Sequence, residues 1–111
     1  TIDLEKECWE KTYDVIVSFE TIEHLANPEF FLENARRTSQ LLIVSTPIEE
    51  FRGYNPHHKQ VWNLTEFKAV LEKYFRCNYY YQEAERILEE PPSRIRFVIA
   101  VGHPVENAGL V

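Results

Sequence analysis

Two carboxylates and a histidine follow one another closely at the end of an apolar run. Glu20, Glu23 and His24 come directly after the run 15–19. A helical turn there would place the three side chains at positions i, i+3 and i+4, on one face. A carboxylate that orients an imidazole is a common general acid/base arrangement. The same donors, completed by His57 from a later segment, could instead bind Mg²⁺ or another divalent cation.

These residue types also have an ordinary structural interpretation. Glu20 and Glu23 would then be solvated acids at a helix start, where the helix dipole favours negative charge. His24 would simply bond a backbone carbonyl. Both interpretations depend on the helical turn, which only the geometry of the folded chain decides.

A second group of candidate residues lies in the segment 46–62, which shows no helical or strand period. A loop of this length in a compact domain is usually functional or disordered. Tyr54, Asn55, His57 and His58 are its candidates for contacts to a substrate. The plainer alternatives are turn chemistry at Asn55 and ordinary surface histidines.

An alternation of strand and helix patterns would position these groups in one α/β domain spanning residues 1–111. Continuous β-branched residues in the first strand predict burial on both faces, as in a parallel sheet. The chain from the first strand to the second reads as a right-handed βαβ unit. A capping box at Asn63 and Glu66 predicts the second helix, whose apolar stripe reaches Tyr74. Predicted strands are 14–19, 41–44, 75–82 and 94–102, the first helix is 28–38, 83–93 is a polar connection, and 103–111 is an irregular tail.

Composition narrows the class of protein. The formal net charge of −6 provides no global positive field for phosphate backbones, which disfavours a nucleic-acid partner. No apolar run approaches membrane-spanning length. Cys8 and Cys77 lie far apart and outside metal-type spacing, as expected for reduced thiols in a cytoplasmic protein.

The order of these segments resembles class I S-adenosylmethionine-dependent methyltransferases. The nearest group is the ubiquinone-biosynthesis-like group, methyltransferase types 11 and 23. The resemblance covers roughly residues 10–82 and includes the family's fourth and fifth strands with their exits. The segments that carry it are 13–25, 27–32, 42–47, 55–58 and 65–75.

The resemblance extends to only one half of the family's domain. The chain has three glycines, Gly53, Gly102 and Gly109, and none opens a strand-turn-helix element of the kind that cradles the cofactor. The chain therefore looks like the C-terminal, acceptor-side half. The family's sheet would give it a Rossmann-like half-sheet with strand order 1-2-4-3, the last strand antiparallel. Strand 14–19 would then be an open edge, available to a second copy or to a complementary chain.

The resemblance also implies roles for individual residues. S-adenosylmethionine would lie beside Ser18, Phe19 and Glu20. His24 is the candidate base, and Glu20 is the candidate for placing a small-molecule or saccharide oxygen or nitrogen acceptor. In the small-RNA 2′-O-methyltransferases, a similar cluster with a later histidine binds a metal.

Three functions compete at this point. The first is a methyltransferase segment that is inactive without its cofactor half. The second is a non-enzymatic interaction protein derived from a methyltransferase, which pairs through its open edge. A metal-dependent RNA 2′-O-methyltransferase segment is the weakest, because the chain is acidic and lacks a basic stripe.

Overall fold

The computed structural model describes residues 9–48, 62–83, 86–91 and 97–105. In chain order its elements are β1 (Tyr13–Phe19), the 3₁₀ helix η1 (Ile22–His24), α1 (Pro28–Thr38), β2 (Ser39–Pro47), α2 (Leu64–Leu71), β3 (Phe75–Glu83), β4 (Arg86–Leu88) and β5 (Phe97–Pro104). The two α-helices and four of the strands come in the chain order that the sequence predicts, and η1 and β4 are additional.

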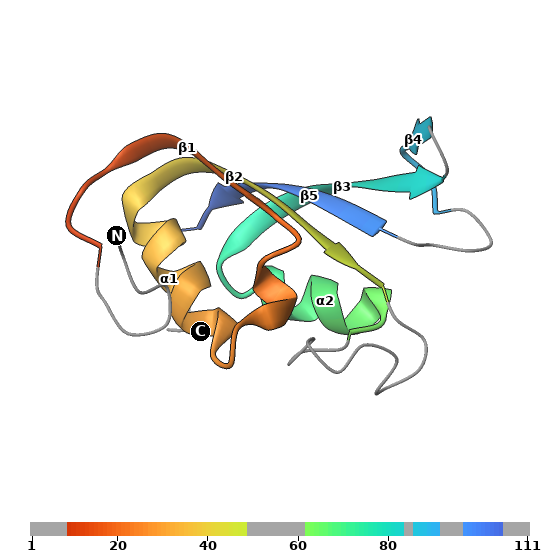
Figure 1. Cartoon of the computed structure of the whole chain (residues 1–111). Helices are drawn as coiled ribbons and strands as arrows, with labels where there is room; N and C mark the ends of the chain where they lie inside the picture. Colours follow the sequence, from red (N-terminus) through yellow and green to blue (C-terminus); the bar gives the residue numbers. More distant parts are fainter. Residues whose placement is uncertain (1–8, 49–61, 84–85, 92–96, 106–111) are drawn as a thin grey trace.

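The strands form one mixed sheet in the order β1-β2-β5-β3-β4 (Figure 1). β1 and β2 are parallel, and β5 runs antiparallel between β2 and β3. The four predicted strands therefore have the predicted order. The complete order differs because β4, a short strand in the expected polar connection, pairs with the end of β3.

The last strand is longer at its C-terminal end than predicted. His103 and Pro104, expected to begin the irregular tail, belong to β5. They face Arg76 and Phe75 across the ladder. The partner strand thus continues the pairing past the end of the apolar pattern, which the sequence alone does not reveal.

Both α-helices and η1 cover the same face of the sheet (Figure 1). Side chains alternate along a strand, so every second residue meets this helical layer. Leu42 and Val44 of β2 and Val98 and Ala100 of β5 are fully buried on it, and α2 contributes Phe67. The core is consequently a single apolar layer between one face of the sheet and the helices.

α2 begins with the capping box that the sequence predicts. The backbone N–H of Glu66 donates to Asn63 Oδ1 at 2.8 Å, and the Asn63 N–H donates to Glu66 Oε1 at 3.0 Å. The helix ends at Leu71, so Tyr74 lies in the turn that follows it. Tyr74 still packs against the core from that turn.

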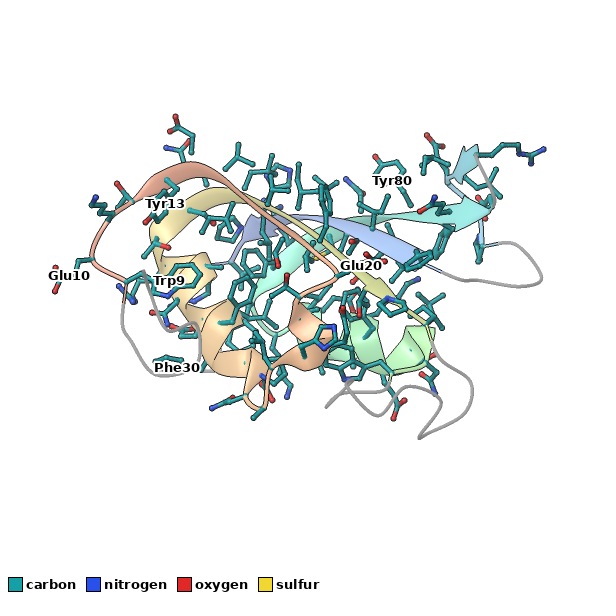
Figure 2. All side chains as sticks on the ribbon, in the orientation of Figure 1. Trp9, Glu10, Tyr13, Glu20, Phe30 and Tyr80 are labelled. Carbon is teal, nitrogen blue, oxygen red and sulfur yellow. The ribbon has the colours of Figure 1, made fainter. Side chains whose placement is uncertain are left out.

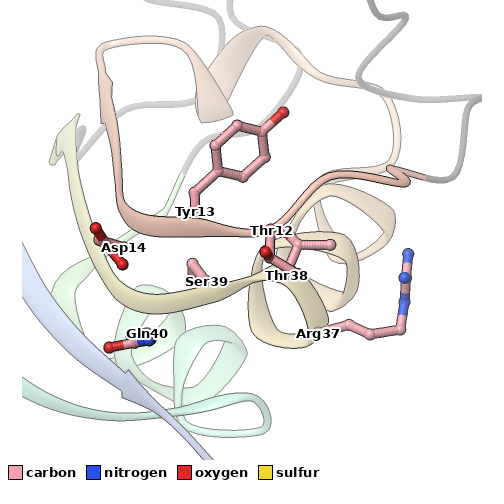
Figure 3. A pocket seen from close by; sticks show the side chains of 7 residues that line it. All are labelled: Thr12, Tyr13, Asp14, Arg37, Thr38, Ser39 and Gln40. Carbon is pink, nitrogen blue, oxygen red and sulfur yellow. The ribbon is translucent and has the colours of Figure 1, made fainter.

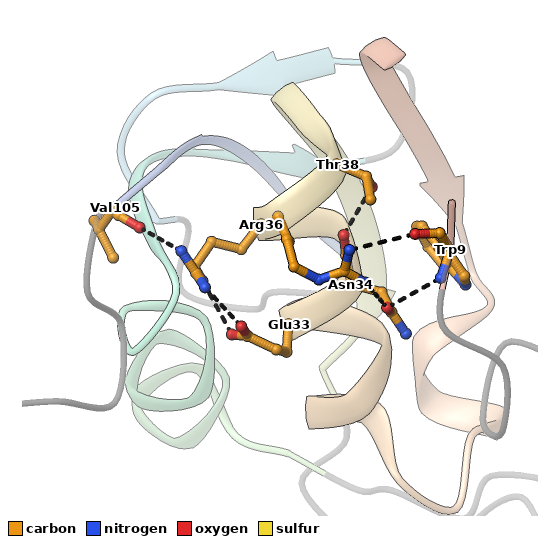
Figure 4. Close-up of polar contacts among 7 residues, drawn as sticks. Trp9, Glu33, Asn34, Arg36, Thr38 and Val105 are labelled. Atoms are coloured by element: carbon orange, nitrogen blue, oxygen red, sulfur yellow. Dashed lines mark hydrogen bonds and ion pairs between the residues drawn. The ribbon is translucent and has the colours of Figure 1, made fainter. Parts of the chain in front are cut away.

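The polar side of α1 holds the segment before β1 (Figure 4). Asn34 Oδ1 accepts from the Trp9 backbone N–H at 3.3 Å and from Arg37 Nη2 at 2.6 Å. The Trp9 indole is buried and makes an edge contact with Phe31, with ring centroids 5.4 Å apart.

The same helix also binds Val105, the residue that follows β5. Arg36 is bidentate on Glu33, at 2.6 and 3.0 Å, and donates to the Val105 carbonyl at 3.2 Å. The hydrogen bonding of the Arg36 guanidinium to Glu33 lowers the pKa of the Glu33 carboxyl. α1 therefore contacts both the segment that precedes β1 and the residue that follows β5.

The second face of β1 is open, contrary to the prediction of burial on both faces. Val15, Val17 and Phe19 are 46%, 53% and 58% exposed.

No described helix is long and apolar enough to cross a bilayer.

Candidate functional site

β1 and β2 end side by side, because parallel strands bring their carboxyl ends to one edge of a sheet. The Glu20 N–H donates to the Ser45 carbonyl at 3.0 Å and extends the ladder by one bond. Glu20 has φ = 52°, in the left-handed region that few residues other than glycine adopt. The chain therefore turns sharply at this residue, which is labelled in Figure 2.

This turn corrects the expectation that Glu20 shares a helical face with Glu23 and His24. The helix is a single 3₁₀ turn over Ile22–His24, and Glu20 lies before it. Glu20 is exposed, whereas Glu23 is buried. The spacing would place the three side chains on one face only in an α-helix. The left-handed backbone at Glu20 excludes an α-helix that begins there.

Glu23 is 1% exposed, an unusual position for a carboxylate. Its Oε2 accepts from the Thr46 hydroxyl at 2.9 Å. Its Oε1 is buried without a hydrogen-bond partner among the described residues. Burial of a polar atom costs free energy unless it is bonded, so this oxygen is poised to accept a donor.

His24 is the neighbour of that oxygen. Its Nε2 lies 3.6 Å from Glu23 Oε1, and its side chain is 44% exposed. The structure thus brings together a buried carboxylate and a solvent-facing imidazole. A carboxylate beside an imidazole can orient the ring, which suits a general base at a surface.

The described residues do not fit a metal site built on three or more ligands. No cluster of three His, Cys, Asp or Glu side chains able to hold an ion occurs in the described part of the chain. Of the predicted ligands, only Glu23 and His24 lie together, and His57 falls outside the described residues.

The predicted cofactor contacts, Ser18, Phe19 and Glu20, follow one another at the end of β1. Ser18 is half-buried, and Phe19 projects onto the open face. The Thr21 hydroxyl donates to the Phe19 carbonyl at 3.2 Å and supports the turn. The predicted substrate contacts, Tyr54, Asn55, His57 and His58, lie outside the described residues.

Thr46 is a member of this site that the sequence analysis missed. It is 0% exposed and provides the hydroxyl that holds Glu23 across 23 positions of sequence. The sequence does contain a signal for it: Thr46 follows the second predicted strand, 41–44, within two residues, and carboxyl ends of neighbouring parallel strands meet. The local spacing around Glu23 and His24 contains no sign of this partner.

A polar pocket lies at the other end of these strands (Figure 3). It involves the start of β1, the start of β2 and the end of α1. Ligands of open α/β sheets bind at the carboxyl ends of the strands, so this pocket is not the preferred candidate. Its lining residues are Thr12, Tyr13, Asp14, Arg37, Thr38, Ser39 and Gln40.

No protein-family model and no curated protein matches the chain. Among solved structures it is similar to the N-terminal domain of EvdMO1, crystallised in the presence of SAH and D-fucose. The TM-score is 0.54 at 16% identity, over 86% of this chain and 48% of that one. The chain thus spans about half the length of this neighbour. At this identity the likeness shows the fold, and the chain has the α/β fold of the matched half of that structure.

Proposed function

We propose that these residues are the acceptor-side half of an S-adenosylmethionine-dependent methyltransferase domain. The observation that carries the proposal is the likeness in fold to a domain crystallised in the presence of SAH. SAH is what remains of S-adenosylmethionine after its methyl group has been transferred. The ordered resemblance of residues 10–82 to S-adenosylmethionine-dependent methyltransferases supports the proposal independently of the fold.

The residues at the carboxyl ends of β1 and β2 have roles in this proposal. Methyl transfer needs an acceptor held in line with the sulfonium methyl and, for many acceptors, a base for its proton. His24 is the proposed base for a hydroxyl or amine of a small molecule or saccharide, and Glu23 fixes its ring. Glu20 places the acceptor. The cofactor would lie beside Ser18, Phe19 and Glu20 and would supply the electrophilic methyl.

A calorimetric titration tests where the cofactor half lies. We expect no stoichiometric binding of S-adenosylmethionine or SAH to these 111 residues alone. The complete natural reading frame that contains them should bind SAH at one site. In that protein Glu20→Ala should weaken SAH binding, while Ile87→Ala, far away on β4, should leave it unchanged.

The outcomes separate the parts of the proposal. Tight binding by the 111 residues alone would refute the claim that the cofactor half lies elsewhere. A complete reading frame that binds neither ligand would refute the methyltransferase assignment itself.

A non-enzymatic interaction protein remains the second candidate. The apolar side chains on the open face of β1 favour it, because exposed apolar patches mark interaction surfaces. The same titration discriminates, since this candidate predicts a partner but no SAH site in the complete protein. An RNA-modifying, metal-dependent enzyme has less support, because the described residues lack a metal cluster of three ligands.

A further inference from the structure

The polar pocket at the amino ends of β1 and β2 is a second candidate binding site, at the opposite end of these strands from Glu23 (Figure 3). The last turn of α1 completes its wall. The cavity volume is about 380 Å³. Small-molecule sites in proteins occupy about 300–1,000 Å³, so the pocket is large enough for a small ligand.

Two hydroxyl groups of the wall act only as hydrogen-bond acceptors toward the pocket. The Thr38 hydroxyl donates to the Asn34 carbonyl at 2.7 Å, and the Ser39 hydroxyl donates to the Ala35 carbonyl at 2.6 Å. A hydroxyl group has one hydrogen and two lone pairs, so these bonds already use the hydrogen of each. The two hydroxyls therefore offer oxygen lone pairs to a ligand.

Asp14 and Gln40 add acceptors at one end of the pocket. The parallel register pairs Tyr13 with Ser39, so the residues that follow them, Asp14 and Gln40, are neighbours. Both are exposed, and Figure 3 shows their side chains at the same end of the pocket. An ionised carboxylate only accepts hydrogen bonds, and an amide can present its carbonyl oxygen. The C-terminal end of α1, at Thr38, contributes the negative end of the helix dipole.

Arg37 lies at the other end of the pocket from Asp14 (Figure 3). Its Nη1 donates to the Trp9 carbonyl at 3.3 Å, and its Nη2 donates to Asn34 Oδ1 at 2.6 Å. These bonds direct the guanidinium toward α1 and the segment before β1. The end of the pocket formed by Asp14 and Gln40 is consequently the one where an additional positive charge is favourable.

We propose that this pocket binds a small organic amine in its ammonium form. The N–H donors of an ammonium group match a wall of carboxylate, amide and hydroxyl oxygens. Its positive charge is attracted by Asp14 and by the end of α1, which favours it over a neutral alcohol of the same shape. The same charges disfavour an anion at this end. The proposal concerns the amino ends of the strands and does not depend on the proposed methyl transfer.

Amide chemical shifts test the binding, with n-butylammonium as the probe and 1-butanol as its neutral isostere. Both are titrated into the complete natural reading frame at constant ionic strength, and the amides of Asp14, Ser39 and Gln40 are followed. n-Butylammonium should give saturable shifts with a dissociation constant of about 1 mM, which is reasonable for a ligand of its size. 1-Butanol should bind at least about tenfold more weakly, because it lacks the charge.

Two substitutions change the charge of the pocket in opposite directions. Asp14→Asn should weaken the binding of n-butylammonium at least about fivefold, and Gln40→Glu should strengthen it about fivefold. The reason is that one unit charge at contact distance in water changes an affinity by a factor of that order. Glu90→Gln removes the same charge from an exposed residue beyond β4, so it is the matched control and should leave the affinity unchanged.

Three outcomes would overturn the proposal. The first is the absence of saturable shifts with n-butylammonium, and the second is equal affinity for the two probes. The third is an equal loss of affinity in Asp14→Asn and Glu90→Gln, which would assign the binding to the net negative charge of the chain. If Asp14→Asn does not fold, an unchanged affinity in Gln40→Glu, at an exposed side chain, would contradict the proposal in the same way. SAH binding is measured separately, so either proposal can fail without the other.

Discussion

At the scale of single residues, the notable feature is the buried pair of Glu23 and Thr46. The Thr46 hydroxyl is the hydrogen-bond donor to the Glu23 carboxylate in the described structure. It fastens the turn after β1 to the end of β2. His24, the proposed base, follows Glu23 directly, so its position depends on this contact.

Thr46→Val should destabilise the fold, because the isosteric methyl leaves Glu23 buried without its donor. The expected loss is about 1–3 kcal/mol in the free energy of unfolding, measured by chemical denaturation. Thr65→Val, on the exposed side of α2, is the control and should change stability by less than about 0.5 kcal/mol.

A double variant isolates the cause of that loss. Combining Thr46→Val with Glu23→Leu should recover part of the stability, because replacing both polar partners with apolar groups is often nearly neutral. If the two substitutions are simply additive, the hydrogen bond is not what holds this turn.

At the scale of elements, Glu29 joins α1 to the turn that follows α2. Its Oε1 accepts from the Tyr74 hydroxyl at 2.9 Å and from Lys73 Nζ at 3.2 Å. The Tyr74 hydrogen bond lowers the pKa of Glu29 below its ordinary value of 4.5. Burial, followed by the hydrogen bond to Glu29, raises the pKa of Tyr74 to about 12.

The sign of the pH dependence follows from these directions. A lowered carboxyl pKa stabilises the fold above 4.5, and the contribution is lost as pH falls through the lowered value. A raised tyrosine pKa stabilises the fold below 10.0, and the contribution is lost as pH rises through about 12.

Glu29→Gln should therefore flatten the acid limb of the stability curve. Denaturation between about pH 3 and about pH 7 should show a smaller difference in unfolding free energy for the variant than for the parent. The effect should be modest, because Glu29 is 42% exposed and water screens the interaction. An unchanged acid limb would show that the contact does not form in solution.

The register of β5 depends on a close approach at Gly102. A Cβ there would lie 2.9 Å from Phe75 Cβ and 3.2 Å from Cys77 Sγ. Burial of that thiol raises its pKa to about 11, so it packs as a neutral side chain. The neighbouring strand has no space for even one additional methyl group.

Gly102→Ala should destabilise the protein by about 1–3 kcal/mol through overpacking. Thermal or chemical denaturation measures the loss, with His103→Ala, exposed on the same strand, as the control. A stable Gly102→Ala protein would mean that β3 shifts freely against β5.

At the scale of the whole molecule, the sheet is covered on one face and open on the other. Three of the large hydrophobic side chains most exposed on the described surface, Val15, Val17 and Phe19, belong to β1. The net charge of −6 opposes association only weakly at physiological salt.

The 111-residue chain on its own should self-associate through β1. Sedimentation equilibrium should show a mass that increases with concentration up to about 100 µM, the range in which transient apolar contacts form. Val17→Lys should shift the equilibrium toward monomer, whereas Ile87→Lys, at the far edge, should not. A monodisperse monomer at every concentration would contradict the expectation.

Local patterns in the sequence determined much of the architecture. The start of α1 at Pro28, the capping box at Asn63 and the apolar strands follow from short-range chemistry, so they could be predicted. The neighbours of β5 could be expected only through the family resemblance, because pairing between distant strands leaves little local signal. β4 and the end of β5 at Pro104 are set by the partner strand, which periodicity does not show.

The candidate site divides in the same way. Spacing alone brought Glu23 and His24 together, since adjacent residues stay adjacent in any turn. Only the tertiary structure separated Glu20 from them, through one left-handed residue, and placed Thr46 against Glu23 from another strand. It also exposed the second face of β1, because burial depends on what packs there and not on how apolar the strand is.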